Sequence, residues 1–240
     1  MSYEFLPEEI RKIKEKYPDL ELSESREGEG ACTIWKGRIP FDRIYKGYRI
    51  IDNCEVKIAI ASDYPESFPV VYEVGGRAEK VGEKWGKKDL RDVHFNPQDG
   101  TLCLCVRQEQ KKKFPPGSDF IDFIELLVIP YFYGLVYFEE NGRWPWKEYS
   151  HGVLGLLEYY AETTEVSVDK IRETTDFIQV YPNQKKLRQQ IKNWHDEFRC
   201  LCGSRDIFSR CHPLAWEGLI KLRKDMGALQ LNAYKLLQPK

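Results

Sequence analysis

The sequence predicts an α+β fold with a small additional module at its C-terminal end. Two observations predict this: a helix, a series of strands, a cysteine-bearing loop and further helices follow one another along the chain, and a second cysteine cluster lies near the C-terminus. The 240 residues allow one large domain, or one domain with a small appendage. A composition of 42% hydrophobic and 31% charged residues is sufficient for a core and too mixed for disorder.

The first third of the chain predicts a helix followed by an antiparallel sheet. Apolar residues recur at helical spacing from Leu6 to Tyr17, and Pro7 stands where a first-turn proline is tolerated. Strand-like runs follow, separated by glycine and charged turns at intervals typical of a meander. These runs cover residues 19–24, 31–39, 48–62 and 70–74. The polar segments 75–96 and 107–119 are expected to be loops.

A helical pattern resumes at Asp119 and continues through Tyr160. Its most apolar part has 13 residues, from Leu126 to Phe138, and is interrupted by Pro130. Because a membrane-spanning helix needs about 20 apolar residues, we expect a buried core segment. The charged segment 166–198 is expected to be a helical linker. The predicted division is therefore a first domain over 1–165, a linker over 166–198 and a module over 199–240.

Charge and cysteine usage exclude several classes of protein. A net charge of −1 creates no global field for nucleic acid or an anionic membrane, so any such contact would have to be local. The N-terminus lacks the basic-then-apolar layout of a signal peptide. The seven cysteines are an odd number, and five of them fall in two tight clusters, unlike a secreted disulfide framework. We expect a cytoplasmic protein whose clustered cysteines serve as metal ligands or nucleophiles.

The first cluster lies in the segment His94–Val106, which reads HFNPQDGTLCLCV. A reactive cysteine works as its thiolate and needs partial exposure. Cys103 follows an Asp99-Gly100 turn and precedes a polar, lysine-bearing loop, so we expect its thiol to be accessible. This placement favours a nucleophile over a packed core cysteine.

This segment resembles the active-site segment of ubiquitin-conjugating enzymes. In that family His-Pro-Asn, an Asp/Asn-Gly turn and the catalytic Cys-Leu follow one another, and His94, Asn96, Asp99 and Cys103 occupy the matching positions. The chain departs from the pattern at Phe95, where the family has proline.

The resemblance extends over roughly residues 1–160. ACTIWKGRIPFDRIYKGYRI and CEVKIAIASDYPESFPVVYEV are similar to the strand meander of the family, including Tyr64-Pro65 and Pro69. FYGLVYFEENGRWPWKEYSHGVLGLLEYY is similar to the bacterial branch found in conjugation and anti-phage (CBASS-type) operons. The implied fold is the antiparallel meander of that family, flanked by N-terminal and C-terminal helices.

The resemblance implies roles for the matching residues. Cys103 would accept an acyl group as a thioester and pass it to an amine. Asn96 would stabilise the oxyanion or hold the loop, His94 would fix the loop, and Asp99 would orient the loop or the incoming amine. The implied partner is the C-terminal tail of a ubiquitin-like protein or of a cGAS-like nucleotidyltransferase. Because the chain has no glycine-rich nucleotide loop, ATP would be consumed by a separate activating enzyme, where one is required.

Cys105 leaves three alternatives open. Residues two apart in an extended segment point to the same face, about 6.5 Å apart at Cα, which is the outer edge of disulfide geometry. Cys105 would then be a redox lock on Cys103, a second acyl acceptor or a half-buried bystander. Two rival functions accompany these alternatives: a non-catalytic interaction module, and an adaptor regulated by oxidation of the Cys103/Cys105 pair.

The second cluster reads CLCGSRDIFSRCH and gathers three cysteines and a histidine within 13 residues. Four such ligands suit a closed tetrahedral zinc site, and Gly203-Ser204 supply a tight turn. The spacing resembles the SEC-C motif, a short zinc-binding module of bacterial proteins. We expect a structural zinc whose binding supplies folding energy to a segment too small for a core of its own. The predicted ligands are Cys200, Cys202, Cys211 and His212.

Overall fold

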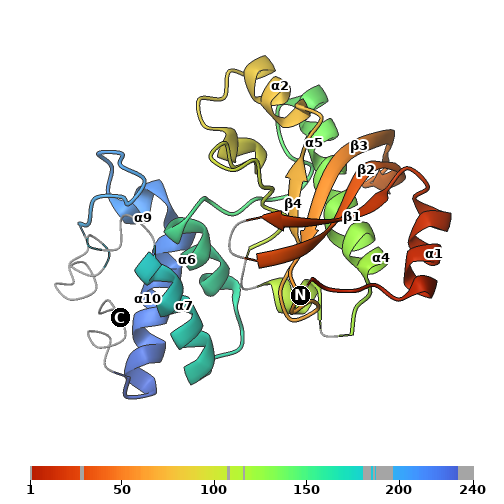
Figure 1. The fold of residues 1–240 in the computed structure, drawn as a ribbon. Coiled ribbons are helices and arrows are strands. Elements are labelled where there is room, and N and C mark those ends of the chain that lie inside the picture. Colours follow the sequence, from red (N-terminus) through yellow and green to blue (C-terminus); the bar gives the residue numbers. More distant parts are fainter. Residues whose placement is uncertain are drawn as a thin grey trace. The chain divides into compact units, whose positions relative to one another are not determined.

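The computed structural model describes residues 2–27, 30–106, 109–115, 117–180, 185, 187 and 197–231. The chain forms two compact units, Met1–Lys147 and Glu148–Lys240, each with its own hydrophobic core (Figure 1). A four-stranded antiparallel sheet with several helices confirms the predicted α+β class.

The first unit begins with one helix and the predicted meander. The strands are hydrogen-bonded in chain order, each antiparallel to its neighbour. The elements are α1 (Pro7–Lys16), β1 (Glu21–Glu27), β2 (Gly30–Tyr45), β3 (Tyr48–Ile60) and β4 (Val70–Glu73). Pro7 starts α1 at the position where its missing N–H costs nothing, and the Glu9 carboxylate accepts the Leu6 N–H at 2.8 Å.

One face of the sheet packs against the apolar segment Phe120–Asn141 (Figure 1). On β3, every second residue from Cys54 to Ile60 is buried, as expected for a strand with one face on the core. The apolar segment comprises α4 (Phe120–Phe123), a π-helical turn η3 (Ile124–Val128) and α5 (Ile129–Asn141). By length and composition it is sufficient to cross a membrane, but 67% of its most apolar window is buried inside the fold, as a core helix would be.

The predicted loop 75–96 is wrong in part, because it contains α2 (Arg77–Lys84) and a 3-10 turn, η1 (Leu90–Val93). The buried Glu73 carboxylate accepts the N–H groups of Gly75 at 2.6 Å and Ala78 at 3.2 Å, which satisfies donors at the start of α2. Only one narrow stripe of α2, including Ala78 and Val81, is buried. A short helix α3 (Gln110–Lys113) also interrupts the predicted loop 107–119.

The second unit contains a helical core in addition to the cysteine cluster. Its helices include α6 (Val153–Glu162), α7 (Val168–Val180), α9 (Phe208–Cys211) and α10 (Pro213–Ala228). The chain therefore divides at 147/148, whereas we placed the end of the first domain at 165. The reason is that α6 packs closely on α10: a Cβ on Gly218 would lie 1.8 Å from the Leu157 carbonyl oxygen.

The segment predicted as a helical linker contributes to the same core. Ile171 and Ile178 of α7 are fully buried among the residues of α6 and α10. Most of the segment between Val180 and Glu197 lies outside the described residues. The C-terminal module is thus larger than the predicted 199–240, since α6 and α7 provide part of its core.

Candidate functional site

The cysteine loop runs beside β4 in the first unit. The Leu102 N–H donates to the Val71 carbonyl at 2.8 Å, and the Cys103 N–H donates to the His94 carbonyl at 2.9 Å. Leu102 also pairs with Phe95 in an isolated antiparallel bridge, so two backbone segments meet just before the thiol. Cys103 is exposed and free. A firmly anchored backbone therefore presents an accessible thiol.

Backbone and side-chain hydrogen bonds close the turn between Phe95 and Leu102. The Asn96 N–H donates to the Thr101 carbonyl at 2.9 Å, and Gly100, at φ +74°, donates to the Asn96 carbonyl at 2.8 Å. The Asp99 carboxylate accepts the Thr101 N–H at 3.0 Å and the Thr101 hydroxyl at 2.7 Å. The Asn96 side-chain N–H points to the same hydroxyl at 3.5 Å. Asp99 thus holds the turn, and Asn96 lies at its base.

His94 connects this turn to the rest of the core. It has a left-handed backbone conformation at φ +53°, and its ring lies 4.8 Å from the Trp144 ring between centroids. The Trp144 indole N–H donates to the Asp92 carbonyl at 3.2 Å, and the Tyr131 hydroxyl of α5 donates to the Val93 carbonyl at 3.0 Å. The sequence pattern assigned no role to Tyr131 or Trp144. Together they hold the backbone of Asp92 and Val93 in place. This fixes the position of His94, whose carbonyl in turn accepts the Cys103 N–H.

We expect Tyr131→Phe to loosen this loop without unfolding the domain. The change leaves the Val93 carbonyl without its buried hydroxyl donor, which costs about 1–3 kcal/mol. Hydrogen exchange should rise at the amides of His94 and Cys103 more than in the β2–β3 ladder. Tyr133→Phe is the matched control, because its hydroxyl donates to the Tyr48 carbonyl instead. Equal exchange at the loop in both variants would contradict the tether.

Cys105 differs from Cys103 in burial and protonation. Its side chain is half-buried against the core of the first unit, and this burial raises its thiol pKa to about 12, although the charge of Lys113 acts in the opposite direction. The Cys103 thiol instead faces the Cys105 carbonyl, with 3.8 Å between sulfur and oxygen. Cys103 is exposed and Cys105 is half-buried, so the two side chains do not share one exposed face, and the chain bends at Cys105. These observations favour the half-buried bystander among the three alternatives for Cys105.

Alkylation should separate the two thiols. At pH 7.5 Cys105 is protonated as well as half-buried, so iodoacetamide should label Cys103 at least about tenfold faster in the folded protein. Peptide mass spectrometry over time measures both rates in one sample. In denaturant the two rates should converge, which serves as the control. Equal labelling of the folded protein would place Cys105 at the surface and restore the second-acceptor alternative.

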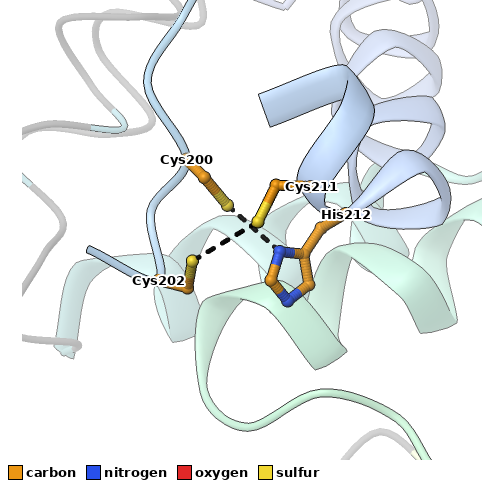
Figure 2. Close-up of side chains that lie close together, drawn as sticks. All are labelled: Cys200, Cys202, Cys211 and His212. Carbon is orange, nitrogen blue, oxygen red and sulfur yellow. Dashed lines mark hydrogen bonds between the residues drawn. The ribbon is translucent and has the colours of Figure 1, made fainter. Parts of the chain in front are cut away.

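The second cluster is a hairpin followed by a helix start. The Cys200 N–H donates to the Asp206 carbonyl at 2.9 Å and the Phe208 N–H to the Phe198 carbonyl at 2.7 Å, closing the hairpin around Gly203. Cys211 ends α9 and His212 immediately precedes α10. Figure 2 shows the four predicted ligands, Cys200, Cys202, Cys211 and His212, converging on one point.

The spacing of these side chains fits a tetrahedral metal ion. The ligand atoms all lie within 4.8 Å of one another. Sulfur atoms of Cys202 and Cys211 are 3.6 Å apart, against about 3.8 Å for two thiolates on one tetrahedral zinc and about 2.05 Å for a disulfide. The Cys200 sulfur lies 3.1 Å from His212 Nδ1. This cluster can therefore bind a metal, as we predicted from the spacing.

Ser204 supports the cluster electrostatically. Its N–H lies 3.4 Å from the Cys202 sulfur and its hydroxyl 3.3 Å from the Cys211 sulfur. Burial opposes ionisation of Cys202, but the hydrogen bonds from Ser204, together with those from Cys200 and Cys211, outweigh it and lower the thiol pKa to about 7. Burial raises the pKa of the deeper Cys200 thiol to about 12 in the absence of an ion. Thiolate binding at Cys200 therefore depends on the charge of a metal.

Comparison of the chain with protein-family models, curated proteins and solved structures finds no match. The structure brings His94, Asn96, Asp99 and Cys103 into one loop of the first unit, and the four metal-ligand candidates into one cluster of the second. Functional arguments therefore rest on the chemistry of these two groups and on the resemblance of the loop.

Proposed function

We propose that the chain is an acyltransferase of the ubiquitin-conjugating type that carries its acyl group on Cys103. The observation that carries the proposal is an exposed thiol on a loop fixed by the His94 and Val71 carbonyls. The proposed acyl group is the C-terminus of a ubiquitin-like protein or of a cGAS-like nucleotidyltransferase, in a bacterial anti-phage system. The location that fits this role is the cytoplasm.

The reaction has two acyl transfers. The Cys103 thiolate attacks the carbonyl carbon of an acyl group already activated as a thioester, and the donor leaves as a thiolate. An amine then attacks the Cys103 thioester, loses a proton to solvent or a base, and releases Cys103 as a thiolate. A free carboxylate is not electrophilic enough for the first step, so the acyl group arrives already activated, by a separate activating enzyme where one is required.

The surrounding residues act on geometry and charge. The side-chain amide of Asn96 lies at the base of the turn. We propose that it donates a hydrogen bond to the oxyanion that develops during acyl transfer. Asp99 is engaged with Thr101, which favours a role in orienting the loop over a role in deprotonating the amine. His94 positions Cys103 through its backbone carbonyl and its ring contact with Trp144.

In the second unit, we assign a structural zinc to the Cys/His cluster. Three cysteines and one histidine complete a tetrahedral shell, so no position remains for a substrate or a reactive water. When bound, zinc would stabilise the three thiolates and hold the hairpin against α10. The acyl transfer does not pass through this metal.

Thioester formation tests the proposal. The protein is incubated with the activating enzyme and the ubiquitin-like or nucleotidyltransferase proteins encoded beside it, and is then run on non-reducing gels. We expect an adduct that dithiothreitol removes, that disappears in Cys103→Ala and that persists in Cys105→Ala. Cys103→Ser should trap a slower oxyester, whose peptide mass identifies the acylated terminus. A chain that forms no adduct with any of these proteins would instead be a non-catalytic interaction module.

A further inference from the structure

A shallow hollow lies beside the metal cluster in the second unit. Its volume is about 310 Å³, and it is lined by the hairpin residues Arg199, Arg205, Asp206 and Ile207 together with Arg210 and Cys211 of α9. The three arginines are exposed. The Arg199–Ile207 bridge and the short helix α9 thus place three arginines that are close in the chain around one hollow.

The charge of this hollow is not balanced by its own lining. Asp206 is the one acidic residue against three arginines. Within the described part of the chain, neither Arg205 nor Arg210 forms an ion pair with a carboxylate. Arg199 donates to the Arg205 carbonyl across the hairpin, which limits the positions its guanidinium can take. Since the whole chain carries a net charge of −1, this excess is a local feature.

A metal bound to the neighbouring cluster would leave the net charge of the hollow positive. Zinc with three thiolates and a neutral histidine carries a formal charge of −1, which offsets part but not all of the positive charge of the lining. The arginines could therefore have another role, which is to neutralise the negative charge of the metal with its three thiolates. One guanidinium would be sufficient for that compensation, whereas three line the hollow.

The number of hydrogen-bond donors around the hollow indicates whether a carboxylate or a phosphate group would bind there. A carboxylate is planar, and one bidentate arginine satisfies it. A phosphate monoester presents three terminal oxygens in a tetrahedral arrangement and a charge of about −2, so it accepts hydrogen bonds from several directions. Three arginines that line one hollow from both sides of the hairpin and from α9 match the second pattern. We infer that this hollow binds a phosphate group, either free phosphate or the phosphate of a small organic ligand.

Titration calorimetry of the metal-loaded full-length protein tests this site. The probes are inorganic phosphate and adenosine monophosphate, with glutarate as a dicarboxylate at equal ionic strength. We expect both phosphates to bind more tightly than glutarate; tighter binding of adenosine monophosphate would identify a phosphorylated organic ligand, and equal binding would identify free phosphate. Arg210→Gln and Arg205→Gln should each weaken phosphate binding by about tenfold or more.

Controls separate anion binding from metal compensation. Arg11→Gln removes the same charge from an exposed position in the first unit and should leave phosphate affinity unchanged. Metal content should remain unchanged in Arg210→Gln, and Arg210→Lys should restore affinity only in part, because lysine lacks the planar fork. Unchanged affinity in both glutamine variants, tighter binding of glutarate, or loss of metal together with affinity would each overturn the proposal. Because the assay does not use Cys103, its result is independent of thioester formation.

Discussion

Loss of the metal from the second unit, by chelation or by Cys202→Ser, should loosen the hairpin tip 200–206 and leave α6, α7 and α10 folded. Without an ion, the tip around exposed Cys202 loses the cross-link between three thiols and an imidazole that lie within 4.8 Å of one another. The base of the hairpin keeps its anchors, because Phe198 and Phe208 are buried in the core of the unit. The helices have their own support, since Leu157, Ile171 and Leu219 are fully buried in one core. Metal binding contributes about 10–16 kcal/mol in isolated zinc-finger peptides, where it is the folding energy. Here its structural effect should be local.

Metal analysis and hydrogen exchange measure this prediction together. We expect about one zinc per chain in the intact protein, none in Cys202→Ser, and increased exchange confined to the amides of the hairpin tip, such as that of Cys200. Cys103→Ser makes the same chemical change at an exposed cysteine of the other unit and should retain both metal and protection. Collapse of helical circular dichroism on chelation would show that the metal supports the whole unit, as the sequence alone suggested.

The sheet and the metal cluster could be predicted because their information is local. The alternation from Cys54 to Ile60 specifies a strand with one buried face, and turns between successive strands specify a meander. The four metal-ligand candidates lie within 13 residues, so spacing alone brings them together. Helix α2 was missed because its burial involves only a narrow stripe, and because its first turn is satisfied by Glu73, which lies outside the helix.

Long-range contacts explain what the sequence could not predict. Tyr131 and Trp144 hold the residues before His94 from 38 and 52 positions away, and no local pattern identifies such pairs. The domain boundary depends on whether α6 joins the sheet or α10, a choice made by the close approach at Gly218. The sequence left three alternatives open for Cys105 because residues two apart share a face only in an extended backbone, and a local pattern does not fix the backbone conformation of a loop.

Asn96→Ala should slow transfer from Cys103 by about 100- to 1,000-fold if its amide stabilises the oxyanion. The structure offers a way to separate this role from holding the loop. The Asn96 amide meets the Thr101 hydroxyl, which also donates to Asp99. Thr101→Val removes that hydroxyl with little change in shape and leaves the amide in place, so it weakens the turn without deleting the oxyanion donor.

Single-turnover transfer of a preformed Cys103 thioester to free lysine, measured beside the iodoacetamide rate of Cys103, distinguishes the two roles. An oxyanion role predicts a large loss of transfer in Asn96→Ala, a small loss in Thr101→Val and similar alkylation in both, since alkylation forms no oxyanion. A purely loop-holding role predicts that both variants lose transfer to a similar extent and that alkylation changes with it. Full transfer in Asn96→Ala would remove Asn96 from the mechanism and leave Cys103 as the only residue of the loop with a chemical role.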